Sequence, residues 1–138
     1  MKNTYFLIFV ALLSTSYAFA GNKLTNKDLS GTWKIADVKI SNSGNSENSI
    51  TVENCYFSDL YRAKLGLVFT ENGQVDYSNY GNPTPGRYEL KDNLIYFFSA
   101  PADGESIERV EFAIKADEQT LTLTKISPAF TETYTFTK

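Results

Sequence analysis

From position 31 onward, the sequence is a succession of short apolar runs, each of strand length, separated by residues that favour turns. Turn signals at such short and regular intervals are typical of an antiparallel sandwich or barrel. No helical pattern of useful length interrupts them, and a single helical turn is expected at 26–29. The sequence therefore predicts an all-β domain. The expected strands lie near 31–40, 50–57, 63–70, 74–80, 86–91, 94–99, 106–115, 120–126 and 130–137.

The pairing of neighbouring strands follows from the register that gathers apolar residues on one face, because a slip of one residue turns every side chain to the other face. Two three-residue loops end at Gly73 and Asn93, which take the left-handed conformation. Tyr96 then faces inward, and a neighbouring segment or a second subunit would cover Ile95 and Phe97 on the opposite face. The expected pairs are Phe69 with Val75 and Leu67 with Tyr77 around 71–73, Leu90 with Leu94 and Tyr88 with Tyr96 around 91–93, and Ile114 with Leu121 and Phe112 with Leu123 around 116–119.

The last strand carries a charged residue that breaks the inward apolar pattern. Its inward positions hold Phe130, Tyr134 and Phe136, whereas its threonines face out. Glu132 lies between these aromatics, and across the Ser-Pro turn it is diagonal to Lys125, which also points inward near the strand end. Such a pair can hold the polar end of a ligand, act as a buried acid and base, or form a partly solvated ion pair at the barrel mouth.

Consecutive hairpins with one apolar and one polar face suit an up-and-down antiparallel barrel, because closing the sheet removes its edge strands. With eight to nine strands, the interior is either just filled by side chains or holds one small ligand. The inward aromatics are therefore either a packed core or the lining of a pocket for an apolar or amphipathic ligand. The candidate ligand-binding residues are Phe69, Tyr77, Tyr88, Tyr96, Phe112, Lys125, Glu132 and Tyr134.

Residues 1–20 have the pattern of an export signal peptide. A lysine precedes an apolar core at 5–13, and small residues end the segment at 18–20. Cleavage there predicts a mature barrel domain at 21–138, secreted or periplasmic. A lipoprotein would need a cysteine directly after the cleavage site, where this chain has Gly21, so we expect a soluble protein. No later apolar run reaches the roughly 20 residues of a membrane-spanning helix.

Composition narrows the chemistry. The chain has no histidine and a single cysteine, which excludes His-based nucleophiles, His-ligated zinc or haem, and an internal disulfide. Cys55 is therefore either buried or paired with another chain. A net charge of −3 without a basic cluster argues against binding to nucleic acid or to an anionic membrane. We expect no metal site, no cofactor and no enzymatic activity, since no close pair of carboxylates lies on one inner face.

A more specific match lies at the first strand. The tripeptide 31–33 is the Gly-x-Trp signature that opens lipocalin barrels, and it directly follows a short helical turn. The segments 69–73 and 86–90 are similar in style to the middle strands of such domains. The chain thus resembles a small secreted lipocalin-like domain of the kind exported by Gram-negative bacteria. The resemblance implies an up-and-down barrel in which Trp33 packs as core at the closed end.

Two further features concern the ends of the barrel. Lipocalins have an Arg near the last strand that packs over the Trp, and the nearest substitutes in this chain are Arg109 and Lys138. At the other end, the aromatic tract 56–62 forms either a lid over the mouth or a satellite cluster tucked under the barrel.

Three hypotheses of different classes follow, and an enzyme that uses carboxylates or tyrosines in the pocket is the least favoured of them. The leading hypothesis is a secreted or periplasmic carrier that binds a small apolar or amphipathic ligand inside the barrel. The alternative is a protein-interaction module, inhibitor or immunity-like, with a packed core and a binding surface on the loops 41–49 and 80–86. Its partner would be another protein or, in a homodimer, a second copy of the chain. An interior cavity large enough for a ligand would discriminate between them.

Overall fold

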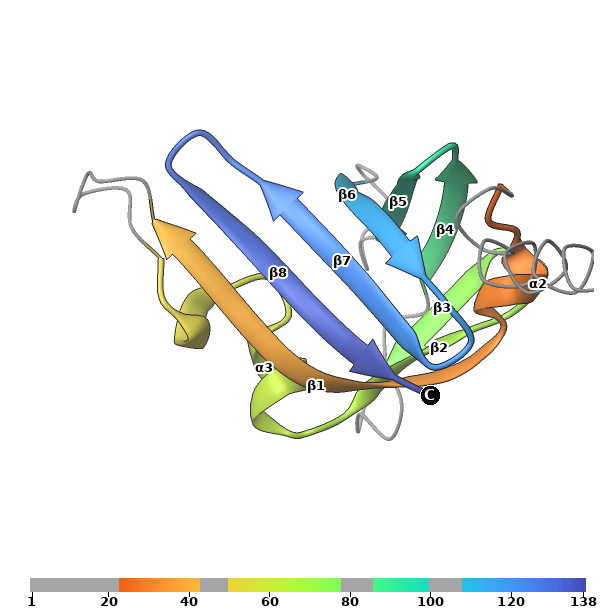
Figure 1. Cartoon of the computed structure of the whole chain (residues 1–138), viewed down its shortest axis with the longest axis horizontal. Helices are drawn as coiled ribbons and strands as arrows, with labels where there is room; N and C mark the ends of the chain where they lie inside the picture. The colour runs from red at the N-terminus through yellow and green to blue at the C-terminus, as the bar shows by residue number, and fades with distance from the viewer. Residues whose placement is uncertain (1–22, 43–49, 78–85, 100–107) are drawn as a thin grey trace, which may run out of the picture.

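Eight strands form a closed antiparallel barrel, in which each strand pairs with its neighbours in sequence and β1 closes on β8 (Figure 1). The expected signal segment 1–20 and most of the loops 41–49 and 80–86 lie outside the described residues. The computed structural model describes residues 23–42, 50–77, 86–99 and 108–138.

The barrel is an up-and-down meander, as the sequence predicts. One helical turn, α2 (Asn26–Leu29), precedes it and is capped by the side chain of Thr25. None of the helices in the described ranges is long and apolar enough to cross a membrane. The strands are β1 (Gly31–Asn42), β2 (Gly66–Phe69), β3 (Gln74–Tyr77), β4 (Gly86–Lys91), β5 (Leu94–Ser99), β6 (Glu108–Ala116), β7 (Thr120–Ile126) and β8 (Phe130–Thr137).

The prediction of a strand at 50–57 is wrong. This part of the connection between β1 and β2 holds a short 3-10 helix, η2 (Val52–Asn54), and leads into α3 (Ser58–Arg62). The side-chain oxygen of Asn54 accepts the backbone N–H of Thr51 at 2.7 Å. A local bond of this kind occupies a backbone group that a strand ladder would need, and it favours a turn over an extended segment.

The hairpin of β2 and β3 has the predicted register. Phe69 pairs with Val75 and Leu67 with Tyr77. Gly73 has a φ of 90°, as the three-residue loop requires.

The register expected for β4 and β5 is wrong by one residue. Lys91 pairs with Leu94 across a two-residue loop, and Asp92, with a φ of 57°, takes the left-handed position expected at Asn93. The run 94–98 is apolar at every position, so the pattern of burial could not choose between two registers.

This slip exchanges the two faces of β5. Tyr96 lies outside, where the guanidinium of Arg109 is 4.5 Å from the centre of its ring. Phe98 is also outside, and the guanidinium of Arg87 lies 4.7 Å from its ring centre. Arginine side chains of β4 and β6 therefore lie over the rings on this outer face. The residues of β5 buried inside are Ile95 and Phe97.

The hairpin of β6 and β7 is shifted by two residues from the expected register. Ala116 pairs with Leu121, and Ile114 pairs with Leu123. A shift of two residues leaves each side chain on its face, so Phe112 and Ile114 are buried inside as predicted.

Trp33 is buried as core at the barrel end near α2, as the sequence predicts. Its indole N–H donates to the carbonyl of Leu29 at 2.7 Å. The ammonium of Lys138 lies 4.9 Å from the indole ring centre, so Lys138, and not Arg109, is the cation over this ring. Gly31, with a φ of 120°, makes room for it, because a Cβ there would lie 3.1 Å from Cε of Lys138.

The long strand β1 pairs with β8 over most of its length but with β2 only from Gly31 to Lys34. Gly66 allows this contact, because a Cβ there would lie 2.3 Å from the carbonyl oxygen of Trp33. Beyond it, a bulge between Ile35 and Asp37 shifts the register of β1. The connection with η2 and α3 packs against this second half of β1 (Figure 1).

Candidate functional site in the barrel interior

The structure brings most of the expected ligand-binding residues together. Lys125 lies at the rim, with 27% of its side chain exposed. Tyr96 is on the outer face, as the register of β5 dictates, and does not line the interior. The backbone of Tyr77 pairs with Leu67, and its side chain lies outside the described part of the chain. The expected residues buried inside the barrel are Phe69, Tyr88, Phe112, Glu132 and Tyr134.

Phe57 fills the middle of this interior, although sequence reasoning assigned it no such place. Its ring is 3% exposed and stacks on Phe112 with 5.5 Å between the ring centres. It also meets Phe97, Tyr134 and Phe136 edge to face, at 5.0 to 6.0 Å. The aromatic tract is thus neither a lid above the mouth nor a separate cluster, because it inserts a side chain into the barrel. Its density of aromatic residues was the only signal in the sequence.

Two compact turns hold Phe57 in this position. Before it, the thiol of Cys55 donates to the carbonyl of Val52 at 3.1 Å. After it, the carbonyl of Phe57 accepts the N–H of Tyr61 at 3.0 Å, and Leu60 of α3 is buried against the core. The ring is therefore positioned by local bonds and by packing. No strand ladder of the described residues includes it.

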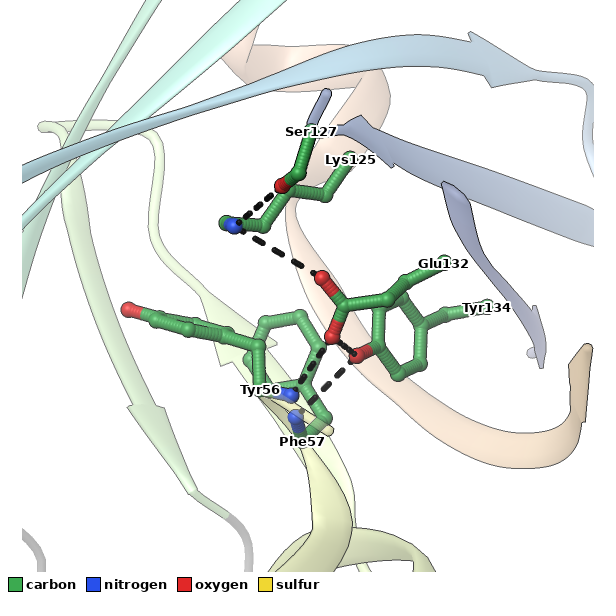
Figure 2. Close-up of polar contacts among 6 residues, drawn as sticks. All are labelled: Tyr56, Phe57, Lys125, Ser127, Glu132 and Tyr134. Carbon is green, nitrogen blue, oxygen red and sulfur yellow. Dashed lines mark hydrogen bonds and ion pairs between the residues drawn. The ribbon is translucent and has the colours of Figure 1, made fainter. Parts of the chain in front are cut away.

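Glu132 is a charged residue buried inside the barrel, with 2% of its surface exposed. Its Oε1 accepts the backbone N–H of Tyr56 at 2.8 Å and the hydroxyl of Tyr134 at 2.7 Å (Figure 2). Its Oε2 lies 3.6 Å from Nζ of Lys125, which donates to the hydroxyl of Ser127 at 3.2 Å. The expected pair of Lys125 and Glu132 is confirmed, although the two residues are directly opposite in register and not diagonal.

Two neutral groups border this carboxylate. Burial raises the pKa of Tyr134, and hydrogen bonds with Glu132 and Cys55 add to the effect. The protonated hydroxyl donates to Glu132 and accepts the N–H of Phe57 at 3.4 Å. Burial is also the main cause that raises the pKa of Cys55. The thiol of Cys55 is buried, which is one of the two alternatives that the sequence left open. Both groups therefore stay protonated near neutral pH.

The interior combines a box of aromatic rings with one carboxylate. Ring edges and faces from Phe97, Phe112 and Phe136 can pack against a flat apolar group. Glu132 can accept hydrogen bonds from an N–H group or an amine placed beside that group. Within the described ranges, no cluster of three His, Cys, Asp or Glu side chains could hold a metal ion. The chemistry on offer is therefore recognition of an aromatic or apolar group with a hydrogen-bond donor.

A function for this chain has to be argued from the site itself, since the barrel architecture serves many functions. No family model, no curated protein and no solved structure matches the chain.

Proposed function

We propose that the protein is a small-ligand-binding barrel whose interior site is filled by its own β1–β2 connection when no ligand is bound. The observation that carries the proposal is the burial of Phe57 among the aromatics of the wall. The segment that bears it belongs to no strand of the barrel, so it can leave without breaking the ladder between any two strands. Opening it costs the two backbone bonds to Glu132 and Tyr134 and the burial of Phe57, but no strand pairing.

The contacts of the connection indicate the class of ligand. Tyr56 and Phe57 present one backbone N–H to Glu132 and one phenyl ring to Phe112. A ligand that replaces them would make the same contacts, with an aromatic or apolar body inside the barrel and an N–H or amine at Glu132. The proposed ligand is therefore a small amphipathic molecule of this kind, and Lys125 and Tyr134 border its polar end.

The buried carboxylate of Glu132 supports this proposal, because burying a charged group in a packed core costs desolvation free energy. An apolar residue at the position of Glu132 would avoid the desolvation of its charge, and replacing buried ion pairs with apolar groups often stabilises proteins. Glu132 also accepts bonds from a wall residue, Tyr134, and from a segment outside the wall, Tyr56.

The free-energy cost of displacing the connection sets a minimum size for the ligand. Exposing Phe57 forfeits about 1.5–3 kcal/mol of burial, which the ligand has to replace. Apparent affinity is also reduced by the small fraction of molecules in which the site is open. A ligand smaller than a phenyl ring would gain too little, so we expect the natural ligand to be at least that large.

The protein is further proposed to be exported and to be related to the lipocalin-like domains. The export signal pattern at 1–20 supports a secreted or periplasmic protein that is soluble after cleavage. The Gly-x-Trp signature, with Lys138 over the ring of Trp33, supports a relationship to the lipocalin-like domains. Mature protein from its native source should begin at Gly21, and N-terminal sequencing that returns Met1 would refute the export signal.

Binding to the wild-type protein tests the proposal. N-phenyl-1-naphthylamine is a suitable probe, because it has aromatic rings, an N–H donor and a fluorescence that rises in apolar surroundings. We expect saturable binding of one probe per chain, with displaced amide signals of Tyr56 and Phe57 in the NMR spectrum. A folded wild-type protein that binds no probe, or one whose Tyr56 and Phe57 signals stay in place on binding, would refute it.

A pair of matched variants separates an evolved site from an artificial hole. Phe57→Ala removes the occupant, whereas Phe136→Ala removes a wall ring of the same size that contacts it. Both variants open space, and engineered apolar cavities do bind small aromatics. We expect the probe to bind Phe57→Ala at least tenfold more tightly than wild type, and Phe136→Ala no more tightly. An equal increase in probe affinity in both variants would indicate only an artificial cavity and would contradict the proposed ligand site.

A second candidate function rests on the outer face of β4, β5 and β6. Arginine and tyrosine are enriched in protein interfaces, and this face alternates them with acidic residues. Because one row is positive and the next is negative, the face is complementary to itself under a two-fold axis, which favours a second copy of the chain as the partner. Sedimentation velocity should then show a dimer that Arg109→Ala abolishes. The two cross-strand rows are Arg87, Phe98 and Arg109, followed by Glu89, Tyr96 and Glu111.

A further inference from the structure

A pocket of about 360 Å³ lies outside the barrel interior, where α3 ends beside β1. Its lining residues come from the stretch of β1 around its bulge and from the end of α3 with the turn that follows, two segments that lie side by side in Figure 1. The pocket is independent of the site around Phe57, because none of the residues of that site lines it. Its lining residues are Lys34, Ile35, Ala36, Tyr61, Arg62 and Lys64.

The charge of this lining is one-sided. Three of the six residues are cationic and none is acidic. Arg62 forms an ion pair with Asp59, one turn earlier on α3. Lys34 and Lys64 have no carboxylate within ion-pair distance among the described residues. Two lysines without an ion-pair partner among the described residues and one arginine therefore line an open pocket, together with Ile35 and Tyr61.

The backbone of Lys64 makes this arrangement more informative. The N–H of Leu65 bonds to the carbonyl of Leu60, and the N–H of Lys64 bonds to that of Tyr61, which together form a Schellman motif at the end of α3. Its left-handed residue is Lys64, with a φ of 55°. Glycine is the usual residue there, because a side chain is strained in this conformation. The chain places a lysine side chain in the pocket at a position where glycine would be more stable.

We propose that this pocket binds a small organic anion, with its phosphate or carboxylate held by Lys34 and Lys64 and its body against Tyr61. A lone inorganic anion would leave most of the volume empty, so an anion that carries a ring or a chain fits better. Arg62 supplies a planar donor that can turn from Asp59 toward the same oxygens. The binding is electrostatic and partly exposed to solvent, so it weakens as salt screens the charges.

NMR titration of the wild-type protein tests this site directly. Phenyl phosphate and phenylacetate carry the two anions on one ring, and benzyl alcohol is their neutral counterpart. We expect the amide signals of Tyr61 to Leu65 to shift with a saturable curve for the phosphate, the carboxylate or both, and not for the alcohol. The stronger of the two anions identifies the group that the site prefers. Absence of saturation with both, or equal binding of the alcohol, would overturn the proposal.

Lys64→Gly is the decisive variant, because it removes the charge and relieves the strained backbone at the same time. We expect it to unfold at the same or a higher temperature than wild type, and to bind the preferred anion at least about fivefold more weakly. Lys34→Gln should also weaken binding. Lys39→Gln is the matched control, since Lys39 is an exposed residue of β1 outside the pocket. Unchanged binding in Lys64→Gly, or an equal loss in Lys39→Gln, would overturn the proposal.

Discussion

The carboxylate of Glu132 accepts the backbone N–H of Tyr56 at 2.8 Å, and this bond joins the last strand of the barrel to the connection between the first two. The next N–H, that of Phe57, donates to the hydroxyl of Tyr134 at 3.4 Å. Two successive backbone donors therefore meet two side chains of β8 that alternate with outward threonines. The inward face of one strand thus holds the segment that fills the barrel.

Removing this carboxylate should loosen the connection. Glu132→Ala removes the carboxylate that accepts the N–H of Tyr56 and forms the ion pair with Lys125, so we expect a loss of about 3 kcal/mol in the free energy of unfolding. Glu132→Gln keeps an oxygen acceptor and should lose less, about 1 kcal/mol. Urea denaturation of the three proteins measures both values. Equal stability of Glu132→Ala and wild type would show that the bond does not hold the connection.

Alkaline pH should destabilise the barrel before it titrates its buried tyrosines. Burial, helped by the charge of Glu71, raises the pKa of Tyr88 to about 12. Its hydroxyl donates to the carbonyl of Thr70 at 2.6 Å. An unfolded tyrosine has a pKa of about 10, so above this pH the unfolded chain loses a proton that the folded barrel keeps. The stabilising contribution is complete below pH 10 and is lost as pH rises through 12.

The measurement is the free energy of unfolding in urea at about pH 8, 10 and 11, where one such group gives a slope of about −1.4 kcal/mol per pH unit above its unfolded pKa. The raised pKa of Tyr134 acts in the same direction. Tyr88→Phe should be less stable at pH 8, because the bond to Thr70 is lost, and should fall less steeply above pH 10. A wild-type stability that stays constant up to pH 11 would contradict the burial of these hydroxyls.

Gly66→Ala should be among the most damaging small substitutions in the chain. A Cβ at Gly66 would lie 2.3 Å from the backbone oxygen of Trp33 and 2.9 Å from Cα of Lys34, so two strands would have to separate. We expect a loss of at least about 3 kcal/mol in the free energy of unfolding. Gly86→Ala is the comparison, because its nearest contact, the carbonyl of Phe98, is at 3.3 Å. Equal effects of the two changes would mean that β1 and β2 are not so close.

Two loop substitutions with opposite signs test the hairpin registers. Gly73→Val places a β-branched side chain at a φ of 90° and should lower the free energy of unfolding by more than about 1 kcal/mol. Asp92→Gly relieves a residue with a φ of 57° and should leave stability unchanged or raise it. Thermal unfolding of both variants gives the two signs. Strong destabilisation by Asp92→Gly would favour the loop with Asn93 in the left-handed position.

Prediction from sequence succeeded where one face of a strand is apolar and the other is polar. The alternation in β8 places Tyr134 and Phe136 inside, and the same pattern sets Phe69 opposite Val75. It failed at β5, because Tyr96 and Phe97 are both large and aromatic and only the backbone of the loop decides which of them is inside. Apolar pattern specifies a face only when the opposite face is polar.

The sequence predicted the polar residues of the candidate site, Glu132 and Lys125, but not Phe57 at its centre. Glu132 and Lys125 stood out because charged residues are rare on an inward face, and the structure brings them together. Phe57 was part of a stretch assigned in part to a strand, and no local pattern indicates that a turn inserts its side chain into a barrel closed by residues far away in sequence. Such an insertion depends on the volume left by all the other rings, which becomes known only with the packed structure.

Barrel closure between β1 and β8 has a consequence for how the chain folds. The longest pairing of the first strand is with the last, from Lys34 opposite Thr137 to Asn42 opposite Phe130. During synthesis, β1 therefore cannot form its main pairing until the residues of β8 have been made. The contact of Phe57 with Tyr134 cannot form before then either. Contacts that span most of a chain slow folding and make it a late, concerted event. A ribosome-bound chain that lacks only β8 should thus remain open to proteases.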